Sequence, residues 1–194
     1  MKAKILEDAV AYAGFFRLHP LTVEHDRFDG GTTGPQVREV LHRSDAAAAL
    51  LYDPAADQVV LIEEYRAGAH LAGAFPWLLD IVAGRIEAGQ TPLEAVKREI
   101  AEEAGLAAKT IVPIGSYLTA PHLSSERLHL FCATVDAAAV AGSHGLAHEG
   151  EDIRPRVLGR AEALRLPEAR PLSLWTALAL GWLERAVSQG LTFR

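Results

Sequence analysis

Three glutamates stand close together near the middle of the chain, in the stretch REIAEEAGL at residues 98–106. They are Glu99, Glu102 and Glu103, and on a helix with about 100° per residue their side chains share one narrow stripe. Two carboxylates about 6 Å apart repel each other by roughly 3 kcal/mol at an effective dielectric constant of about 20. A solvated helix face would weaken this repulsion, so a surface role is one interpretation. A divalent cation among the carboxylates is the other, because hard oxygen ligands suit Mg²⁺ and Mn²⁺.

The flanking residues predict a helix over residues 92–104, which would carry the three glutamates. The stretch TPLE at residues 91–94 combines a threonine cap, a proline suited to the first turn and a glutamate that completes a capping box. Gly105 is a stop signal. A second stripe of this helix is apolar and is assigned to the core; it consists of Val96, Ile100 and Ala104.

Over residues 84–106 the sequence resembles the box that defines the Nudix hydrolases. The stretch reads GRIEAGQTPLEAVKREIAEEAGL. The family pattern is a glycine, five residues, a glutamate, seven residues and then R-E-U-x-E-E-x-G-U, where U is apolar. Eight of its nine fixed positions match. The resemblance implies an α/β (α+β) fold, an α/β/α sandwich with a mixed sheet, and hydrolysis of a diphosphate that is linked to another group.

The resemblance also implies how the box residues act. Glu99 and Glu103 correspond to direct ligands of the divalent metal, and Glu102 corresponds to a ligand or to a residue just behind the ligands. The backbone carbonyl of Ala83 joins the metal shell in relatives. Cations of this kind, Mg²⁺ or in its place Mn²⁺, neutralise the diphosphate, orient it and activate a water molecule. Glu99 and Glu103 are therefore expected to be catalytic.

Gln90 stands where the box has a glutamate. In the family that carboxylate commonly pairs with the box arginine, which is Arg98 here, and supports the metal-binding helix. Glutamine keeps a hydrogen-bond acceptor but loses the charge. The departure predicts weaker metal affinity together with retained activity.

Outside the box the chain looks similar to the bacterial ADP-ribose pyrophosphatases over nearly its full length. Pro121 stands sixteen positions after the box glycine Gly105, where a proline marks the ADP-ribose enzymes. The other matching pieces are GFF at 14–16, VVLIEEYR at 59–66, PWLLDIVAG at 76–84, SER at 125–127 and HGLAHEGEDIR at 144–154. The resemblance implies that ADP-ribose is split into AMP and ribose 5-phosphate.

Two alternatives to this function stay open. His122 and Leu123 follow the marker proline, where family members often carry glycines, and bulkier side chains there would reshape the pocket for the terminal ribose. Another nucleoside diphosphate sugar, such as GDP-mannose, is therefore an alternative substrate. The second alternative is a non-catalytic sensor of ADP-ribose or of a nucleotide sugar. Gln90 favours it, whereas the retained acids of the helix and of the loop described below argue against it.

Four residues outside the box match substrate-binding positions of the ADP-ribose enzymes. Arg66 ends an apolar strand, where a buried charge needs a partner. The matching arginine binds a substrate phosphate, and a surface salt bridge with Glu63 or Glu64 is the alternative. Glu126 corresponds to a residue that hydrogen-bonds the adenosine or its ribose, or contacts the metal-bound diphosphate, and a solvated side chain is the alternative. Phe15 and Arg38 correspond to residues that grip adenine, often across a dimer interface, and an aromatic face with a guanidinium plane suits a purine. Sheet packing and a surface charge are the alternatives for this pair.

Residues 141–155, AGSHGLAHEGEDIRP, form a polar, glycine-rich segment of about the length of a functional loop. In the resembled enzymes this loop closes over the substrate and supplies the general base. Glu149 matches that base best, and Glu151 matches a further metal contact. Spacing does not decide which acid takes the proton, and solvated loop acids are the alternative interpretation.

The elements around these residues predict two parts. Residues 1–45 contain imperfectly alternating segments and the turn-rich stretch DGGTTGP, which predict a small β subdomain for dimerisation and adenine contact. Residues 46–194 are expected to form the hydrolase domain. Its predicted strands are AAAALLYD, QVVLIEEYR, WLLDIVAG, IVPIGSYLT, RLHLFCATVD and a short one near 156–158, followed by helices that begin near 159 and 173. A homodimer is expected from the family likeness and the apolar N-terminal segments.

The composition narrows the class of protein. The 194-residue chain has a formal net charge of -6, which argues against a sequence-independent nucleic-acid binder. Its single cysteine, Cys132, lies in an apolar run, so no intramolecular disulfide is possible and a reducing compartment fits. No run reaches the ~20 apolar residues that a membrane span needs. A cytoplasmic protein without a membrane role is therefore predicted.

Overall fold

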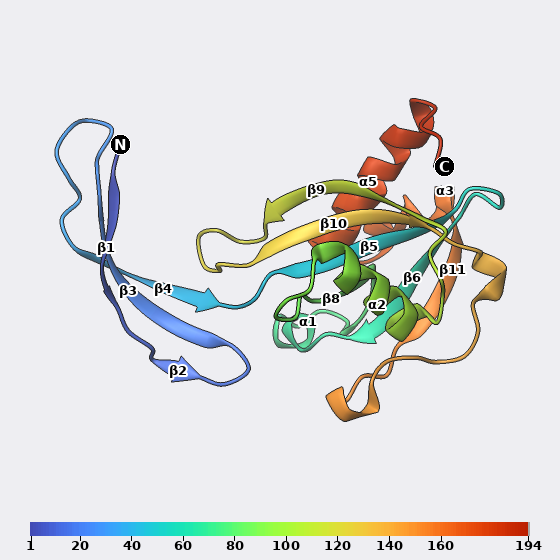
Figure 1. Cartoon of the computed structure of the whole chain (residues 1–194), viewed down its shortest axis with the longest axis horizontal. Coiled ribbons are helices and arrows are strands. Elements are labelled where there is room, and N and C mark those ends of the chain that lie inside the picture. Colours follow the sequence, from blue (N-terminus) through green and yellow to red (C-terminus); the bar gives the residue numbers. More distant parts are fainter. Residues whose placement is uncertain (194) are drawn as a thin grey trace. The chain divides into compact units, whose positions relative to one another are not determined.

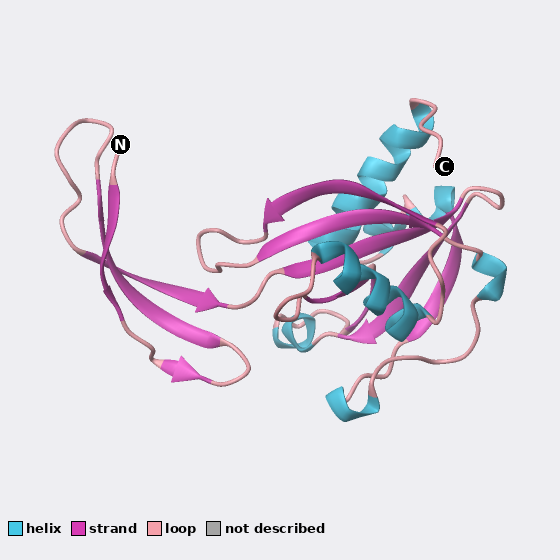
Figure 2. Cartoon of the chain, in the orientation of Figure 1, coloured by secondary structure: helices cyan, strands magenta, loops and turns pink. Residues whose placement is uncertain are grey.

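The computed structural model describes residues 1–193, apart from the side chain of Glu149. These residues fall into two compact units. The first comprises Met1–Asp45 together with Tyr117–Leu128, and the second contains the other described residues. Figure 1 traces the elements along the chain, and Figure 2 shows that the first unit consists of strands and loops, whereas the helices belong to the second.

The sheet of the first unit has β3 at its centre. Its strands are β1 (Ala3–Asp8), β2 (Tyr12–Ala13), β3 (Arg17–His25) and β4 (Gln36–His42). β1, β2 and β4 all pair with β3 antiparallel. The stretch DGGTTGP turns the chain between β3 and β4, as predicted, and its three glycines have positive φ angles that suit this residue. None of residues 1–45, all of which are described, is buried, so this sheet has no core of its own.

The second unit is built on a seven-stranded sheet. Its strands are β5 (Ala46–Asp53), β6 (Gln58–Tyr65), β7 (Trp77–Asp80), β8 (Val82–Arg85), β9 (Thr110–Leu118), β10 (Arg127–Thr134) and β11 (Arg154–Gly159). Five of them follow the order β11-β6-β5-β10-β9, while β7 pairs with β6 and β8 pairs with β5. All eight residues of β5 are buried, so both faces of the sheet are covered there.

One predicted strand, WLLDIVAG, is two strands in the structure. β7 ends at Asp80 and pairs with β6, whereas β8 begins at Val82 and pairs with β5. Between them the N–H of Ile81 donates a hydrogen bond to the hydroxyl oxygen of Thr176 at 3.1 Å. The prediction of one strand is wrong because both halves are apolar, and periodicity cannot show that they serve different neighbours.

Two long helices cover the sheet, α2 (Pro92–Ala104) and α5 (Leu174–Ser188). α2 contacts β5 and β8, and α5 contacts β5. Figure 1 shows α2 in front of the strands and α5 behind them. The predicted α/β/α sandwich is confirmed, and α2 has the predicted bounds because its capping signals are local.

Short helices lie in the connections. They are α1 (Ala67–Leu71), α3 (Arg160–Ala163), α4 (Leu166–Ala169) and the 3₁₀ turns η1 (Ala137–Ala139) and η2 (Ala147–Glu149). The helix predicted to begin near residue 159 is α3, and it is only four residues long. α1 has no predicted counterpart, since five residues are too few to show a helical period.

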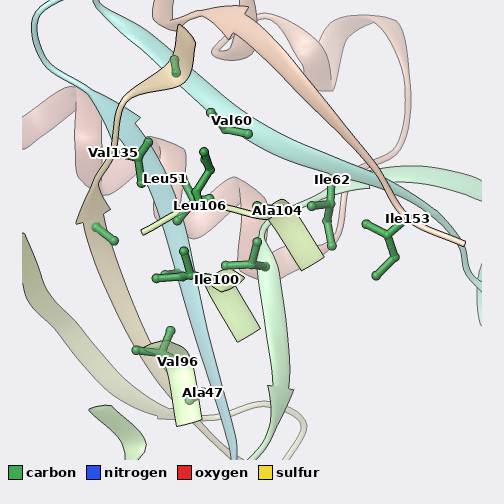
Figure 3. Packing of buried hydrophobic residues seen from close by; sticks show 14 of the residues in the cluster. Ala47, Leu51, Val60, Ile62, Val96, Ile100, Ala104, Leu106, Val135 and Ile153 are labelled. Atoms are coloured by element: carbon green, nitrogen blue, oxygen red, sulfur yellow. The ribbon is translucent and has the colours of Figure 1, made fainter. Parts of the chain in front are cut away.

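The apolar stripe of α2 packs into the main core. Val96, Ile100 and Ala104 are buried, as predicted, and Figure 3 shows them among the apolar side chains of β5 and β6. This packing sets the rotation of the helix, and therefore the direction in which Glu99 and Glu103 point. No helix in the described part of the chain is long and apolar enough to cross a membrane.

Candidate active site

Caps at both ends of α2 determine where its glutamates lie. The Thr91 hydroxyl oxygen accepts a hydrogen bond from the Glu94 N–H at 3.3 Å, and the Glu94 carboxylate accepts one from the Thr91 N–H at 2.8 Å. These reciprocal bonds form the predicted capping box. Gly105 ends the helix at a φ of 64°, and a Cβ atom there would lie 2.2 Å from the His144 ring. Glycine is therefore required both by backbone conformation and by space.

Glu103 is a buried carboxylate, with only 3% of its surface exposed. Its Oε2 atom accepts a hydrogen bond from the backbone N–H of Ala83 at 2.8 Å, which joins α2 to β8. Burial raises the pKa of Glu103 well above its usual range; the Ala83 N–H opposes this shift, and the neighbouring carboxylates of Glu99 and Glu64 add to it. The side chain therefore lies among like charges that a cation would balance.

Glu99 is buried on the same stripe of α2. Its Oε1 atom lies 2.7 Å from the guanidinium of Arg98. Burial raises the pKa of Glu99 to about 7, although Arg98 lowers it, while Glu102 and Glu151 contribute to the increase. A Cβ atom on Gly84 would lie 1.7 Å from the Glu99 carboxylate, so the box glycine leaves the space that this carboxylate occupies.

Glu102 is more exposed than the other two glutamates and pairs with Arg98 at 2.7 Å. The same guanidinium donates to the backbone carbonyl of Arg85 at 3.0 Å. Arg98 therefore bridges Glu99, Glu102 and the end of β8. Gln90 instead accepts a hydrogen bond from the Glu87 N–H at 3.2 Å, which closes the turn before α2.

Arg66 follows β6 and is held by two carboxylates. One of its nitrogens lies 2.8 Å from Glu64 Oε2, and another lies 3.3 Å from Asp80 Oδ2. Burial raises the pKa of Glu64; Arg66 lowers it, while Glu151 and Asp80 raise it further. The guanidinium is a third exposed, so it is anchored on one side and remains accessible on the other.

The acidic loop reaches the same region. The N–H of Gly145 donates to the backbone carbonyl of Glu102 at 3.1 Å, and the Glu151 carboxylate accepts from the Leu146 N–H at 3.0 Å. Glu151 also acts electrostatically on Glu64 and Glu99. The backbone of Glu149 ends η2, but its side chain, the predicted general base, lies outside the described residues.

The other predicted substrate residues belong to the first unit. Glu126 is 4% exposed, accepts a hydrogen bond from the Thr119 hydroxyl at 2.9 Å and forms an ion pair with Arg43 at 2.8 Å. Phe15 is 70% exposed and its ring packs edge-on against the next residue at 4.7 Å. Arg38 is exposed and donates to the carbonyl of its neighbour at 3.0 Å. The carboxylates and Arg66, by contrast, lie in the second unit.

A separate pocket of about 400 Å³ lies beside β6. Its lining residues are Glu63, Phe75, Trp77, Ser143, Asp152 and Arg154. Glu63 and Glu64 are successive residues of one strand, so their side chains point to opposite faces of the sheet. The pocket is therefore distinct from the carboxylate cluster on the α2 side, although both include residues of the acidic loop.

Asp80 is a member of the cluster that was not predicted from the sequence, and Glu64 was predicted only as an alternative ion-pair partner of Arg66, which it is. Both lie in apolar strands that were assigned to the core. A signal was present, because an acidic residue in an otherwise apolar strand needs a partner when it is buried. For each of them that partner is Arg66.

A family model, that of the NUDIX domain, matches residues 42–176, which is more than half of the chain. The chain belongs to the Nudix family. The ADP-ribose pyrophosphatase of Escherichia coli (strain K12) is 39% identical over 182 residues, which cover 93% of this chain and 87% of that protein. The ADP-ribose pyrophosphatase of Haemophilus influenzae is 37% identical over 190 residues, covering 96% and 88%. The predicted likeness to these Nudix enzymes is confirmed.

Two further comparisons extend this result. A GDP-mannose pyrophosphatase of Pectobacterium atrosepticum is 30% identical over 189 residues, covering 93% of this chain and 96% of that protein. A crystal structure of an ADP compounds hydrolase superposes with a TM-score of 0.74 at 22% identity, covering 99% of this chain and 98% of that one. The structural comparison shows a shared fold.

Members of the Nudix family depend on a divalent metal ion, and the donor set here suits one. Within residues 1–193, leaving the Glu149 side chain aside, no three His, Cys, Asp or Glu side chains already stand in metal-binding positions. The carboxylates of Glu99 and Glu103 are instead engaged by Arg98 and by the Ala83 N–H. Because both are buried and repelled by other carboxylates, a hard cation would remove the cost of keeping them ionised.

Proposed function

We propose that the protein is an ADP-ribose pyrophosphatase that hydrolyses ADP-ribose to AMP and ribose 5-phosphate, using Mg²⁺ or in its place Mn²⁺. The observation that carries the proposal is the similarity of nearly the whole chain to enzymes of that name, at 37% and 39% identity. The buried carboxylates of α2 and the anchored guanidinium of Arg66 supply the groups that this reaction needs.

The cation would be held chiefly by Glu99 and Glu103, with the backbone carbonyl of Ala83, while Glu102 and Glu151 complete the set. When bound, it neutralises the diphosphate and makes a coordinated water molecule more acidic. Binding requires Glu99 to leave its ion pair with Arg98, which keeps Glu102 as its partner.

The remaining steps belong to side chains of the protein. Arg66 binds a phosphate oxygen of the substrate through the exposed side of its guanidinium. Glu149 accepts the proton that water loses as its oxygen bonds to phosphorus and the anhydride P–O bond breaks. The bridging oxygen leaves with the other phosphate group. Phe15 and Arg38 grip the adenine, and Glu126 contacts the adenosine or the diphosphate.

The β subdomain of residues 1–45 is proposed to serve dimerisation as well as adenine contact, with residues 46–194 as the hydrolase domain. Its sheet carries no buried residue in residues 1–45 and exposes apolar side chains on its strands, among them Ile5, Tyr12 and Val37. A small sheet gains stability when its apolar side chains pack against another element. A second copy of the chain supplies such a surface in a homodimer.

A substrate panel with oxygen labelling tests the proposal. Pure protein is incubated with ADP-ribose and Mg²⁺ in ¹⁸O-water, and AMP and ribose 5-phosphate are separated to find which carries the label. Release of AMP supports the proposal, and the product that carries ¹⁸O identifies the attacked phosphorus. GDP-mannose is the control substrate, because a relative of that activity is 30% identical. Equal or faster turnover of GDP-mannose would overturn the assignment.

A further inference from the structure

Asp80, at the end of β7, connects the C-terminal helix to the phosphate-binding side of the site. It is buried, and its Oδ1 atom accepts hydrogen bonds from the hydroxyls of Ser173 and Thr176, both at 2.6 Å. Its other oxygen, Oδ2, faces the Arg66 guanidinium at 3.3 Å. The Asp80 carboxylate therefore connects Arg66, which follows β6, with the first turn of α5.

The two hydroxyls are held rigidly by the first turn of α5. Ser173 caps the helix by accepting a hydrogen bond from the Thr176 N–H at 3.1 Å. Thr176 is fully buried, and its hydroxyl oxygen also accepts from the Ile81 N–H at 3.1 Å. The start of α5 therefore holds both residues of the junction between β7 and β8. It binds the carboxylate of Asp80 and the backbone N–H of Ile81.

These contacts determine which way the Asp80 carboxylate turns. Oδ1 is directed toward the two hydroxyl donors and also accepts from the Ile81 N–H at 3.0 Å, so Oδ2 is left for Arg66. Fixing a free arginine side chain costs conformational entropy, because its rotamer freedom is lost. A guanidinium that is already fixed before the diphosphate binds avoids part of this cost in the binding step. Glu64 lies 2.8 Å from the other terminal nitrogen of Arg66, so each of the two terminal nitrogens faces a carboxylate.

We propose that Asp80, oriented by Ser173 and Thr176 at the start of α5, is a positioning residue that presets Arg66 for the diphosphate of the substrate. The inference rests on the proposed function only in taking Arg66 as the phosphate-binding group. Asp80 does not touch the substrate, and its effect passes through Arg66. The C-terminal helix thereby contributes to substrate binding without lining the site.

Removal of one hydroxyl tests this role. Thr176→Val keeps the shape of the side chain but loses the hydrogen bonds of the hydroxyl with Asp80, Ile81 and Ser173, whereas Thr176→Ser retains the hydroxyl. We expect Thr176→Val to lower kcat/KM about tenfold, mainly through KM, because a charge-assisted hydrogen bond is no longer oriented. Thr176→Ser should retain most of the wild-type kcat/KM. Thr134→Val is the matched control, since Thr134 is also buried and accepts from a backbone N–H, that of Thr110 at 3.1 Å.

A double-mutant cycle separates positioning from general stability. In an Arg66→Gln background, Thr176→Val is expected to have no further effect on kcat/KM, because the residue through which it acts is gone. A full tenfold effect in that background, or an equal loss of kcat/KM in Thr134→Val, would show that Thr176 acts through stability alone and would overturn the proposal.

A readout without substrate keeps the two proposals apart. In ¹⁵N NMR spectra of the arginine side chains, the Arg66 Nε–H signal should shift and broaden in Thr176→Val and in Asp80→Asn, and stay in place in Thr176→Ser and Thr134→Val. If the wild-type protein does not cleave ADP-ribose but this signal responds, the proposed function fails and the positioning stands. If the protein is active and the signal does not respond, the positioning fails.

Discussion

The Glu103 carboxylate accepts a hydrogen bond from the backbone N–H of Ala83, 20 residues earlier in the chain, at 2.8 Å. This bond joins the helix that carries the candidate metal ligands to the strand whose carbonyl is a further candidate ligand. It also keeps one carboxylate oxygen engaged while the other remains available. Glu103 is therefore held in place before a cation binds, whereas Glu99 is still paired with Arg98.

Replacement of Glu103 by glutamine is expected to lower activity without lowering stability. Turnover of ADP-ribose should fall at least about 100-fold, the scale on which loss of one charge-stabilising group slows an enzyme. Glutamine can still accept from the Ala83 N–H and removes a buried charge, so the metal-free variant should unfold at the same temperature as the wild type or higher. Thermal unfolding in EDTA and in Mg²⁺ measures this. Full activity of the variant would contradict the assignment of Glu103 as a ligand.

Gly84→Ala is expected to displace the Glu99 carboxylate. The added Cβ atom would lie 1.7 Å from Glu99 Oε1, so the side chain must move and metal affinity must fall. The measurement is the Mg²⁺ concentration that gives half of the maximal rate, which should rise about tenfold or more. Gly181→Ala in α5 is the matched control, because no atom lies within 4 Å of its added Cβ. Equal behaviour of the two variants would show that the space beside Glu99 is not needed.

Gln90→Glu should strengthen metal binding. In the structure Gln90 accepts from the Glu87 N–H at 3.2 Å, and a glutamate keeps that acceptor while adding the negative charge that the family pattern has there. The half-saturating Mg²⁺ concentration should fall, with little change in the maximal rate. Gln90→Ala is the control and should not show this gain. An unchanged Mg²⁺ dependence of Gln90→Glu would mean that Arg98 needs no partner beyond Glu99 and Glu102.

If the protein dimerises through the first unit, a charge introduced on the sheet of that unit should weaken the dimer. Ile5 is 63% exposed on β1, and Ile5→Lys should shift the protein from dimer toward monomer, because a charge is costly to bury in an apolar interface. Sedimentation velocity measures the change. Leu191→Lys, which alters an exposed apolar residue of the second unit, is the control. A wild-type monomer at micromolar concentration would refute the dimer.

Features that depend on neighbouring residues could be predicted from the sequence. The bounds of α2 follow from a capping box and a terminal glycine, and the burial of its apolar stripe follows from helical spacing. The acidic stripe also follows from spacing, and the box pattern identified its chemistry. Each of these signals lies within about 20 residues, where geometry is nearly independent of the rest of the fold.

Pairings between distant residues could not be predicted in this way. Asp80 meets Thr176 across 96 positions, and nothing in either local segment indicates the other. The choice among the glutamates is also tertiary, because Glu102 and Glu99 share Arg98 whereas Glu103 turns to Ala83. The break between β7 and β8 has the same origin, since a hydroxyl of α5 accepts from the Ile81 N–H.

Asp53, which lies away from the candidate active site, should make the stability of the fold depend on pH. It is buried at the end of β5 and accepts hydrogen bonds from the N–H groups of Ala137 and Ala55, both at 2.9 Å. The Ala137 N–H is the main cause of a lowered pKa of Asp53, and burial opposes it. A carboxyl whose folded pKa lies below its unfolded pKa of about 3.9 stabilises the fold fully above that pH and loses the contribution as pH falls through the folded value.

Asp53→Asn should therefore be less stable than the wild type at pH 7, because its amide nitrogen cannot accept from a backbone N–H. The difference in the free energy of unfolding should narrow as the pH falls below about 4, because the wild-type carboxylate then becomes protonated. Urea unfolding at a series of pH values measures both curves. Parallel curves over this range would show that the Asp53 charge contributes nothing to the stability of the turn between β10 and η1.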